Sequence, residues 1–213
     1  MPSTPPSTDT AAPAGTAAEP GQLGRLLPWL LLVAGLVGSL AAFVLTIEKL
    51  ASAADSNYIP SCNLNPVLNC GSVMDTHQAQ VFGFPNSLLG IAGFAVVAAT
   101  GAGLLAGACF ARWYWLGLQL GVTAAAIFVH WLIIQSLYVI GALCPYCMIV
   151  WAVTIPIFWY VTLRNLCAGT FGRPLRTSAP TTSGNHLVPV TMWFLIVAAL
   201  VLHRFSAYWT TLV

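Results

Sequence analysis

The chain has 213 residues, of which 58% are hydrophobic and only 6% are charged, and its formal net charge is +2. A soluble domain carries about 25% charged residues, so this composition excludes an ordinary water-soluble protein and indicates that lipid is the main solvent. The small net charge gives no reason to expect a nucleic-acid partner.

The predicted elements are a tail followed by five apolar segments. Residues 1–24 are rich in Pro, Ser, Thr and Ala and contain no apolar run, which predicts a disordered cytoplasmic tail. Residues 25–210 are predicted to form a single membrane domain. A transmembrane helix needs about 20 apolar residues, and the predicted spans are about 27–48, 84–109, 113–139, 143–163 and 187–208.

Two breaks organise these spans. Residues 49–83 hold charged residues and prolines and are predicted to be a polar loop outside the membrane. From Trp113 to Leu163 there is no Lys, Arg, Asp or Glu, but this stretch is too long for one span. Gly141 and Pro145 mark a break within it, which predicts two helices joined by a tight turn. The predicted fold class is therefore an all-α membrane protein with five transmembrane helices.

The arginines predict the orientation of these helices, because cytoplasmic loops carry an excess of Lys and Arg. With five spans, the N-terminus, the turn after the second span and the loop after the fourth share one face. That face holds Arg25, Arg112, Arg164, Arg173 and Arg176. The other face holds only Lys49 and Arg204. The N-terminus is therefore predicted to be cytoplasmic, and the 49–83 loop exoplasmic.

Four of the six cysteines fall on the predicted exoplasmic face. Cys62 and Cys70 lie in the long loop, and Cys144 and Cys147 form a C-P-Y-C motif at the start of the fourth span. Disulfides form and persist in oxidising compartments outside the cytoplasm. Both pairs are therefore candidates for disulfide chemistry.

The C-P-Y-C motif suits thiol–disulfide exchange, in which a thiolate is the nucleophile. A helix N-terminus stabilises an anion, and Pro145 is tolerated there because it needs no partner for a missing N–H. Two other interpretations stay open for the motif alone, namely a static disulfide and half of a zinc site. The second cysteine pair on the same face favours redox chemistry over both.

Three motifs, in their order along the chain, resemble the vitamin K epoxide reductase family. They are the Cys62–Cys70 loop followed by Gly-Ser-Val-Met, the segment Gly-Phe-Pro-Asn-Ser-Leu-Leu-Gly at residues 83–90, and the C-P-Y-C motif. The resemblance covers roughly residues 26–163 and is to bacterial members, which serve disulfide-bond formation. Each motif alone is unspecific, whereas the ordered combination is specific.

The resemblance implies a four-helix bundle around a quinone, with the fifth helix as an addition. It implies that Cys144 and Cys147 are the redox centre and that Cys62 and Cys70 are a shuttle pair. Asn86 matches the family asparagine that hydrogen-bonds a quinone carbonyl. Trp151 stands where vertebrate members have a quinone-binding Tyr, and its indole N–H can still donate a hydrogen bond.

The implied function is that of a quinone-dependent thiol oxidase in the cell inner (plasma) membrane, with a quinone of the menaquinone or ubiquinone type. It would reoxidise a thioredoxin-like disulfide-bond donor on the exoplasmic side. Bacterial members often carry a fused thioredoxin-like domain, and since this chain has no room for one, a separate partner is expected. Alternatives are another quinone-linked thiol oxidase of the four-helix type, reduction of a vitamin K-like epoxide or quinone in the physiological direction, and a non-catalytic channel or scaffold with structural disulfides.

Three further residues receive less specific interpretations. His130 lies in the middle of the third span, and the sequence favours neither a functional role nor a neutral histidine bonded to a neighbouring helix. Cys109 and Cys167 fall on the predicted cytoplasmic face and are expected to be ordinary reduced thiols.

Overall fold

The computed structural model describes residues 22–55, 57–171 and 187–209, and most of the predicted tail lies outside them. Five of its helices are long and apolar enough to cross a membrane, which confirms the predicted all-α membrane fold. They are α1 (Gln22–Ala54), α3 (Asn86–Leu105), α4 (Arg112–Ile134), α5 (Pro145–Cys167) and α8 (Leu187–Arg204).

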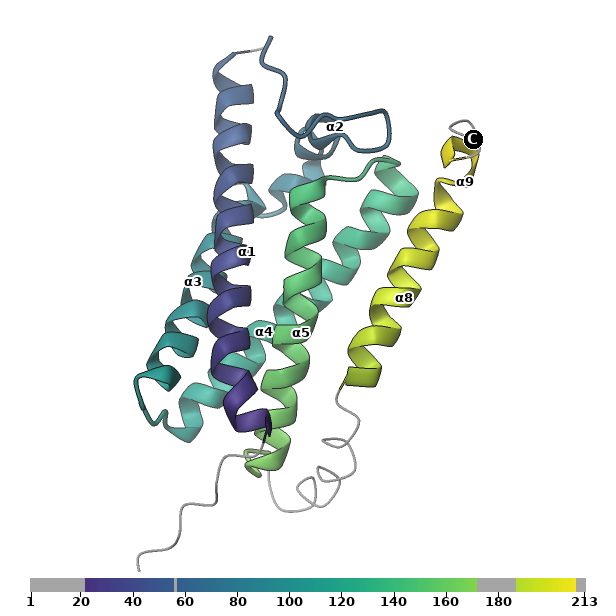
Figure 1. Ribbon diagram of the computed structural model, residues 1–213. Coiled ribbons are helices and arrows are strands. Elements are labelled where there is room, and N and C mark those ends of the chain that lie inside the picture. The colour runs from purple at the N-terminus through teal and green to yellow at the C-terminus, as the bar shows by residue number, and fades with distance from the viewer. Residues whose placement is uncertain (1–21, 56, 172–186, 210–213) are drawn as a thin grey trace, which may run out of the picture.

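Shorter elements join these helices. A π-helix, η2 (Gln135–Ile140), continues α4, and α9 (Ser206–Trp209) follows α8. Between α1 and α3 lie α2 (Cys70–Met74) and the 3-10 helix η1 (His77–Gln80). We call residues 57–85 the cap, because Figure 1 places them over one end of the helices.

Several helix ends differ from the sequence-based prediction, and two of these differences concern the cap and a cysteine. The helix α1 continues to Ala54, six residues past the predicted end, and Glu48 is buried within it. Glu48 tolerates this position because it accepts hydrogen bonds from the Tyr58 hydroxyl and the Ser61 backbone N–H of the cap. The helix α3 ends earlier than predicted, at Leu105, so the free Cys109 lies in the turn before α4.

Four helices form a bundle in which α1 packs against α3 and α5, and α4 packs against α5 (Figure 1). The approach of α1 to α3 depends on a small residue, because a Cβ on Gly35 would lie 2.6 Å from the backbone N of Ala98. By contrast, the backbones of α3 and α4 lie apart, and their contact is made by side chains such as the hydrogen-bonded Thr100 and Tyr114 at the end away from the cap. The bundle is therefore closed on the α1 side and open between α3 and α4.

A short backbone pairing fastens the cap to the bundle. Gly141 has a φ of 71°, a left-handed conformation that glycine adopts readily, and it turns the chain out of η2. Leu143 then donates its backbone N–H to the Val67 carbonyl over 2.8 Å, and its own carbonyl accepts from the Asn69 N–H over 2.9 Å. This parallel bridge holds the cap to the residue that precedes Cys144.

Polar side chains fasten α4 to α5 at the end away from the cap. Asn165 is fully buried and donates to the Gln119 side-chain oxygen over 3.0 Å. The Arg164 guanidinium lies 3.6 Å from the centre of the Trp115 ring. Arg112 lies at the same end and donates to the Thr170 carbonyl over 2.9 Å. Two of the predicted cytoplasmic arginines therefore share the end opposite the cap.

Candidate functional site

The first cysteine pair forms a disulfide inside the cap. Cys62 and Cys70 are bonded, with their Cα atoms 5.6 Å apart, and both are buried, at 5% and 0% exposure. Asparagine side chains shape the loop between and beside them. Asn63 accepts from the Gly71 N–H over 3.0 Å, and Asn65 accepts from the Leu68 N–H over 2.7 Å. These side chains accept hydrogen bonds from backbone N–H groups of the loop, as backbone carbonyls do in helices and sheets.

The second pair begins α5. Cys144 is the N-cap residue in an extended conformation, and its sulfur accepts from the Cys147 backbone N–H over 3.5 Å. Pro145 occupies the first turn, where its missing N–H leaves no bond unmade. The S–H of Cys147 and the N–H groups of this turn hold the pKa of the Cys144 thiol below its ordinary value, against the opposing effect of burial. Both cysteines are free thiols here.

The two pairs meet at one sulfur–sulfur contact. The sulfur of Cys70 lies 3.2 Å from the sulfur of Cys144, although 74 residues separate them in the sequence. Both side chains are fully buried, within an apolar cluster that includes Leu45, Val73 and Met74. The bridge between Leu68 and Leu143 brings this contact about, because Cys144 directly follows Leu143 and Cys70 comes two residues after Leu68. Of the two loop cysteines, Cys70 is therefore the one beside the C-P-Y-C motif.

A cavity of about 1060 Å³ lies beside the second pair and is lined mainly by residues of α3 and α4. Its lining runs from Cys147 near the cap to Tyr114 in the first turn of α4 at the far end. Glycines widen it, because a Cβ on Gly93, Gly117 or Gly121 would have no neighbour within 4 Å. Ligand pockets typically enclose about 300–1,000 Å³. The cavity can therefore hold a large, elongated apolar molecule.

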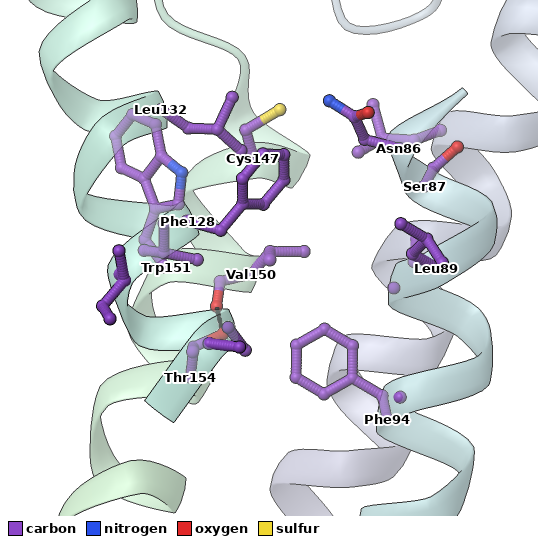
Figure 2. Close-up of a pocket in the computed structure, with 18 of the residues that line it drawn as sticks. Asn86, Ser87, Leu89, Phe94, Phe128, Leu132, Cys147, Val150, Trp151 and Thr154 are labelled. Carbon is purple, nitrogen blue, oxygen red and sulfur yellow. Dashed lines mark hydrogen bonds between the residues drawn. The ribbon is translucent and has the colours of Figure 1, made fainter. Parts of the chain in front are cut away.

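Polar groups gather at the cap end of this cavity. In Figure 2 the Cys147 sulfur and the Asn86 carboxamide face one another across it, and the Trp151 indole comes from the wall of α5. Asn86 donates to the Gln78 carbonyl over 2.6 Å and accepts from the Val81 N–H over 3.2 Å. A carboxamide has two N–H donors, so Asn86 has a second N–H for a bound molecule.

Gln78 and Gln135 are among the polar lining residues that sequence reasoning missed. The Gln78 side chain donates to the Gln135 oxygen over 3.4 Å, which connects the cap with the first residue of η2 across the end of the cavity. Polar side chains inside spans are rare, and π-helices are frequent at functional sites. The signal that could have identified Gln135 is a glutamine in an otherwise apolar part of a predicted span.

The remaining candidate residues lie away from this site. His130 has both ring nitrogens hydrogen-bonded, to the Ala126 carbonyl over 2.7 Å and to the Trp193 indole N–H over 2.8 Å. It is thus bonded to the neighbouring helix α8 and does not line the large cavity. Cys109 and Cys167 lie at the end opposite the cap. Within the described residues, no group of three His, Cys, Asp or Glu side chains is placed to hold a metal ion.

A comparison with protein-family models identifies the family. A family model described as the vitamin K epoxide reductase family matches residues 29–162, which is more than half of the chain. The match includes both cysteine pairs, Asn86 and Trp151, and ends before α8 begins. Among curated proteins, none matches the chain at a significant level.

Proposed function

The chain belongs to the vitamin K epoxide reductase family and is therefore an oxidoreductase, and from this premise we propose that it is a quinone-dependent thiol oxidase. The observation that carries the proposal is a continuous series of contacts along which electrons could pass from the loop disulfide to the cavity. The Cys62–Cys70 disulfide touches Cys144 through one sulfur, and Cys147, one helical turn further, lines the large cavity.

The first step is exchange with a reduced thiol protein. Cys62 is the acceptor, because Cys70 is fully buried against Cys144. A partner thiolate attacks the Cys62 sulfur, the Cys62–Cys70 bond breaks, and Cys70 leaves as a thiolate. The second thiol of the partner then displaces Cys62 and closes the partner's own disulfide. The partner is oxidised by two electrons and the loop pair is reduced by two.

The second step moves these electrons to the C-P-Y-C motif. The Cys70 thiolate attacks Cys144 in a Cys144–Cys147 disulfide, so the bond between Cys70 and Cys144 forms and Cys147 leaves as a thiolate. Cys62 then attacks Cys70, which restores the loop disulfide and releases Cys144. The backbone N–H groups of the first turn, which help to lower the pKa of Cys144, also stabilise it as the leaving thiolate. The structure corresponds to the state after this step, with an intact loop disulfide and two free thiols.

The cavity fits a quinone, since it is long and apolar and carries its polar groups at the end beside Cys147. A quinone bound there would accept the two electrons and two protons given up as the Cys144–Cys147 disulfide closes. Cys147 provides the thiol that faces the cavity. Asn86 holds an N–H toward the place where an oxygen would gain negative charge, and Trp151 offers a second donor from the opposite wall.

The proposed setting is a plasma membrane with the N-terminus in the cytoplasm and the cap outside. The arginines at the end opposite the cap, Arg112 and Arg164, support this orientation. The partner is a thioredoxin-like disulfide-bond donor on the outer side, and the quinone is of the menaquinone or ubiquinone type. Entry of the quinone from the bilayer is supported by the sparse contact between α3 and α4.

Thiol labelling with and without quinone tests the proposal. In membranes depleted of quinone, Cys144 and Cys147 should accumulate as thiols, and addition of quinone should return them to a disulfide within the same sample. A scaffold with structural disulfides would show the same labelling in both conditions, and that result would contradict the proposal. Mass spectrometry of alkylated peptides gives the redox state of each pair, with Cys109 as the internal standard for full labelling.

A further inference from the structure

The end of α8 reaches the two cysteine pairs from outside the family match. Most of α8 covers the bundle only loosely, because none of the residues in its membrane-spanning window is buried, although Trp193, Val197 and Val201 pack against the bundle. Beyond this window the chain turns inward at Phe205, which is only 7% exposed. Phe205 belongs to the same apolar cluster as Val67, Leu143 and Trp151. This cluster therefore contains residues from both segments that the bridge joins.

Arg204, the residue before Phe205, adds a polar contact between the end of α8 and η2. Its Nε donates to the carbonyl of Leu137 over 2.8 Å. Leu137 lies in η2, whose last carbonyls have no partner within the helix because the chain turns away at Gly141. A cation near a helix C-terminus is also favoured by the helix dipole. Arg204 thus acts as a side-chain cap on the helix that leads to the C-P-Y-C motif.

A short series of contacts connects these two residues with the sulfurs. Arg204 fixes the end of η2, and three residues after Gly141 the chain reaches Cys144. Phe205 belongs to the apolar cluster that also contains Val67 and Leu143, whose backbones hydrogen-bond to each other in the bridge. That bridge sets the 3.2 Å contact between Cys70 and Cys144. Arg204 and Phe205, which we call the α8 brace, thus support both sides of the contact.

We propose that the α8 brace positions Cys144 against Cys70 and thereby sets the efficiency of exchange between the two cysteine pairs. The inference rests on the proposed function, because it concerns the relay between the pairs. Exchange needs the sulfurs aligned and nearly touching, and displacements of about 1 Å can cost a reaction about a hundredfold. The two residues are positioning residues, since neither touches a sulfur atom.

The experiment uses the full chain in lipid nanodiscs and a Cys147→Ser background. There the Cys144 thiolate can attack Cys70, which forms the Cys70–Cys144 bond and frees Cys62 without any external oxidant. The equilibrium ratio of the Cys70–Cys144 bond to the Cys62–Cys70 bond, read by peptide mapping after acid quenching, measures how well Cys144 is positioned. Arg204→Gln and Phe205→Ala should each lower this ratio by about tenfold. Arg204→Lys should retain most of it, and His203→Gln, the matched control on an exposed neighbour, should leave it unchanged.

A second measurement separates positioning from a general loss of structure. In a background of Cys62→Ala and Cys70→Ala, the Cys144–Cys147 dithiol should reduce a short-chain quinone equally fast with and without the brace substitutions. The inference is overturned if the bond ratio does not change, if Arg204→Lys behaves like Arg204→Gln, or if quinone reduction falls in parallel with the ratio. A different result would contradict the proposed function as well: the proteins with native Arg204 and Phe205 would form no Cys70–Cys144 bond in the first background and would not reduce quinone in the second. Failure of the brace inference alone is thus distinguishable from failure of the proposed function.

Discussion

Cys144 and Cys147 belong to one motif but have different surroundings. Cys144 is fully buried beneath the cap and touches Cys70, whereas Cys147 is half-buried and lines the cavity. In the proposed relay, Cys144 would receive the electrons from Cys70 and Cys147 would pass them to the quinone. The three-residue spacing keeps the two sulfurs within one helical turn of each other, while the cap covers Cys144 and leaves Cys147 at the cavity.

The pKa of Cys144 provides the first prediction at this scale. The hydrogen bond from the Cys147 S–H is the largest contribution that lowers this pKa, so Cys147→Ala should raise it. A lowered pKa means that the thiolate is present at lower pH than for a free cysteine, whose pKa is about 8.5. The thiolate absorbance of Cys144 should therefore rise with pH at a lower midpoint in the native protein than in Cys147→Ala. An unchanged midpoint would remove Cys147 as the cause.

Trapping of the mixed disulfide provides the second prediction. Cys147→Ser removes the thiol that would release Cys144, so an internal crosslink should accumulate between Cys144 and Cys70, the nearer of the two loop cysteines. Peptide mapping under non-reducing, acid-quenched conditions identifies the bonded pair. Cys144→Ser should give no such crosslink, and both variants should lose oxidase activity. Full turnover by Cys147→Ser, or a crosslink to Cys62 alone, would contradict the relay.

Asn86 provides the third prediction. Asn86→Ala removes the N–H that faces the cavity, and one hydrogen bond contributes about 0.5–1.5 kcal/mol, or more where charge develops. Quinone turnover should therefore fall by about tenfold, while exchange between the loop pair and the thiol partner stays intact. Leu88→Ala, a substitution on the same helix at a residue that does not line the cavity, should have little effect on either reaction. Equal turnover by Asn86→Ala and the native protein would exclude Asn86 as a quinone ligand.

The chemistry of single residues could be predicted from the sequence where a motif is local. The C-P-Y-C motif and the start of a helix are adjacent in the chain, and together with the second cysteine pair on the same predicted face they favoured redox chemistry. The sequence left open which loop cysteine lies beside Cys144. That answer depends on the Leu68–Leu143 bridge between distant segments, which no local pattern predicts.

At the scale of secondary structure, the apolar runs predicted five spans and the structure contains five such helices. Helix ends were harder to predict, because α1 is prolonged by the hydrogen bonds that Glu48 accepts from the cap. The π-helical end of α4 and the asparagine-supported fold of the cap were also missed. The π-helical end receives a tertiary hydrogen bond from Arg204 to Leu137, and the cap depends on local but irregular bonds from asparagine side chains.

The open space between α3 and α4 provides a prediction for these elements. Gly121 lines the cavity, and a Cβ at this position would have no neighbour within 4 Å, so Gly121→Leu should fill part of the hollow. The KM for a long-tailed quinone should rise by about tenfold, because a few methylenes of buried apolar contact are lost at about 0.8 kcal/mol each. A tail-less quinone should be affected much less. Leu120→Phe on the exposed side of the same helix is the matched control, and equal effects on both quinones would contradict this role of the cavity.

For the whole molecule, the prediction concerns orientation. The cap and the α3–α4 turn lie at opposite ends of the bundle (Figure 1), so they should lie on opposite sides of the membrane. A variant that keeps only Cys109 should be protected from a membrane-impermeant thiol reagent in intact cells. A variant in which Asn57→Cys is the only cysteine should be labelled. The reverse pattern would place the redox centre in the cytoplasm and overturn the proposed function.

In the proposed oxidase, the burial of the loop disulfide would determine which electron donors the protein can accept. Because Cys62 is only 5% exposed and Cys70 is not exposed at all, small thiols in the surrounding water have no direct line of attack on either sulfur. A protein that binds the cap can use its binding energy to uncover Cys62, whereas a small thiol has no comparable contact surface. In the proposed oxidase, the cap therefore shields the loop disulfide from small thiols, so that quinone is consumed for protein substrates and not by the general thiol pool.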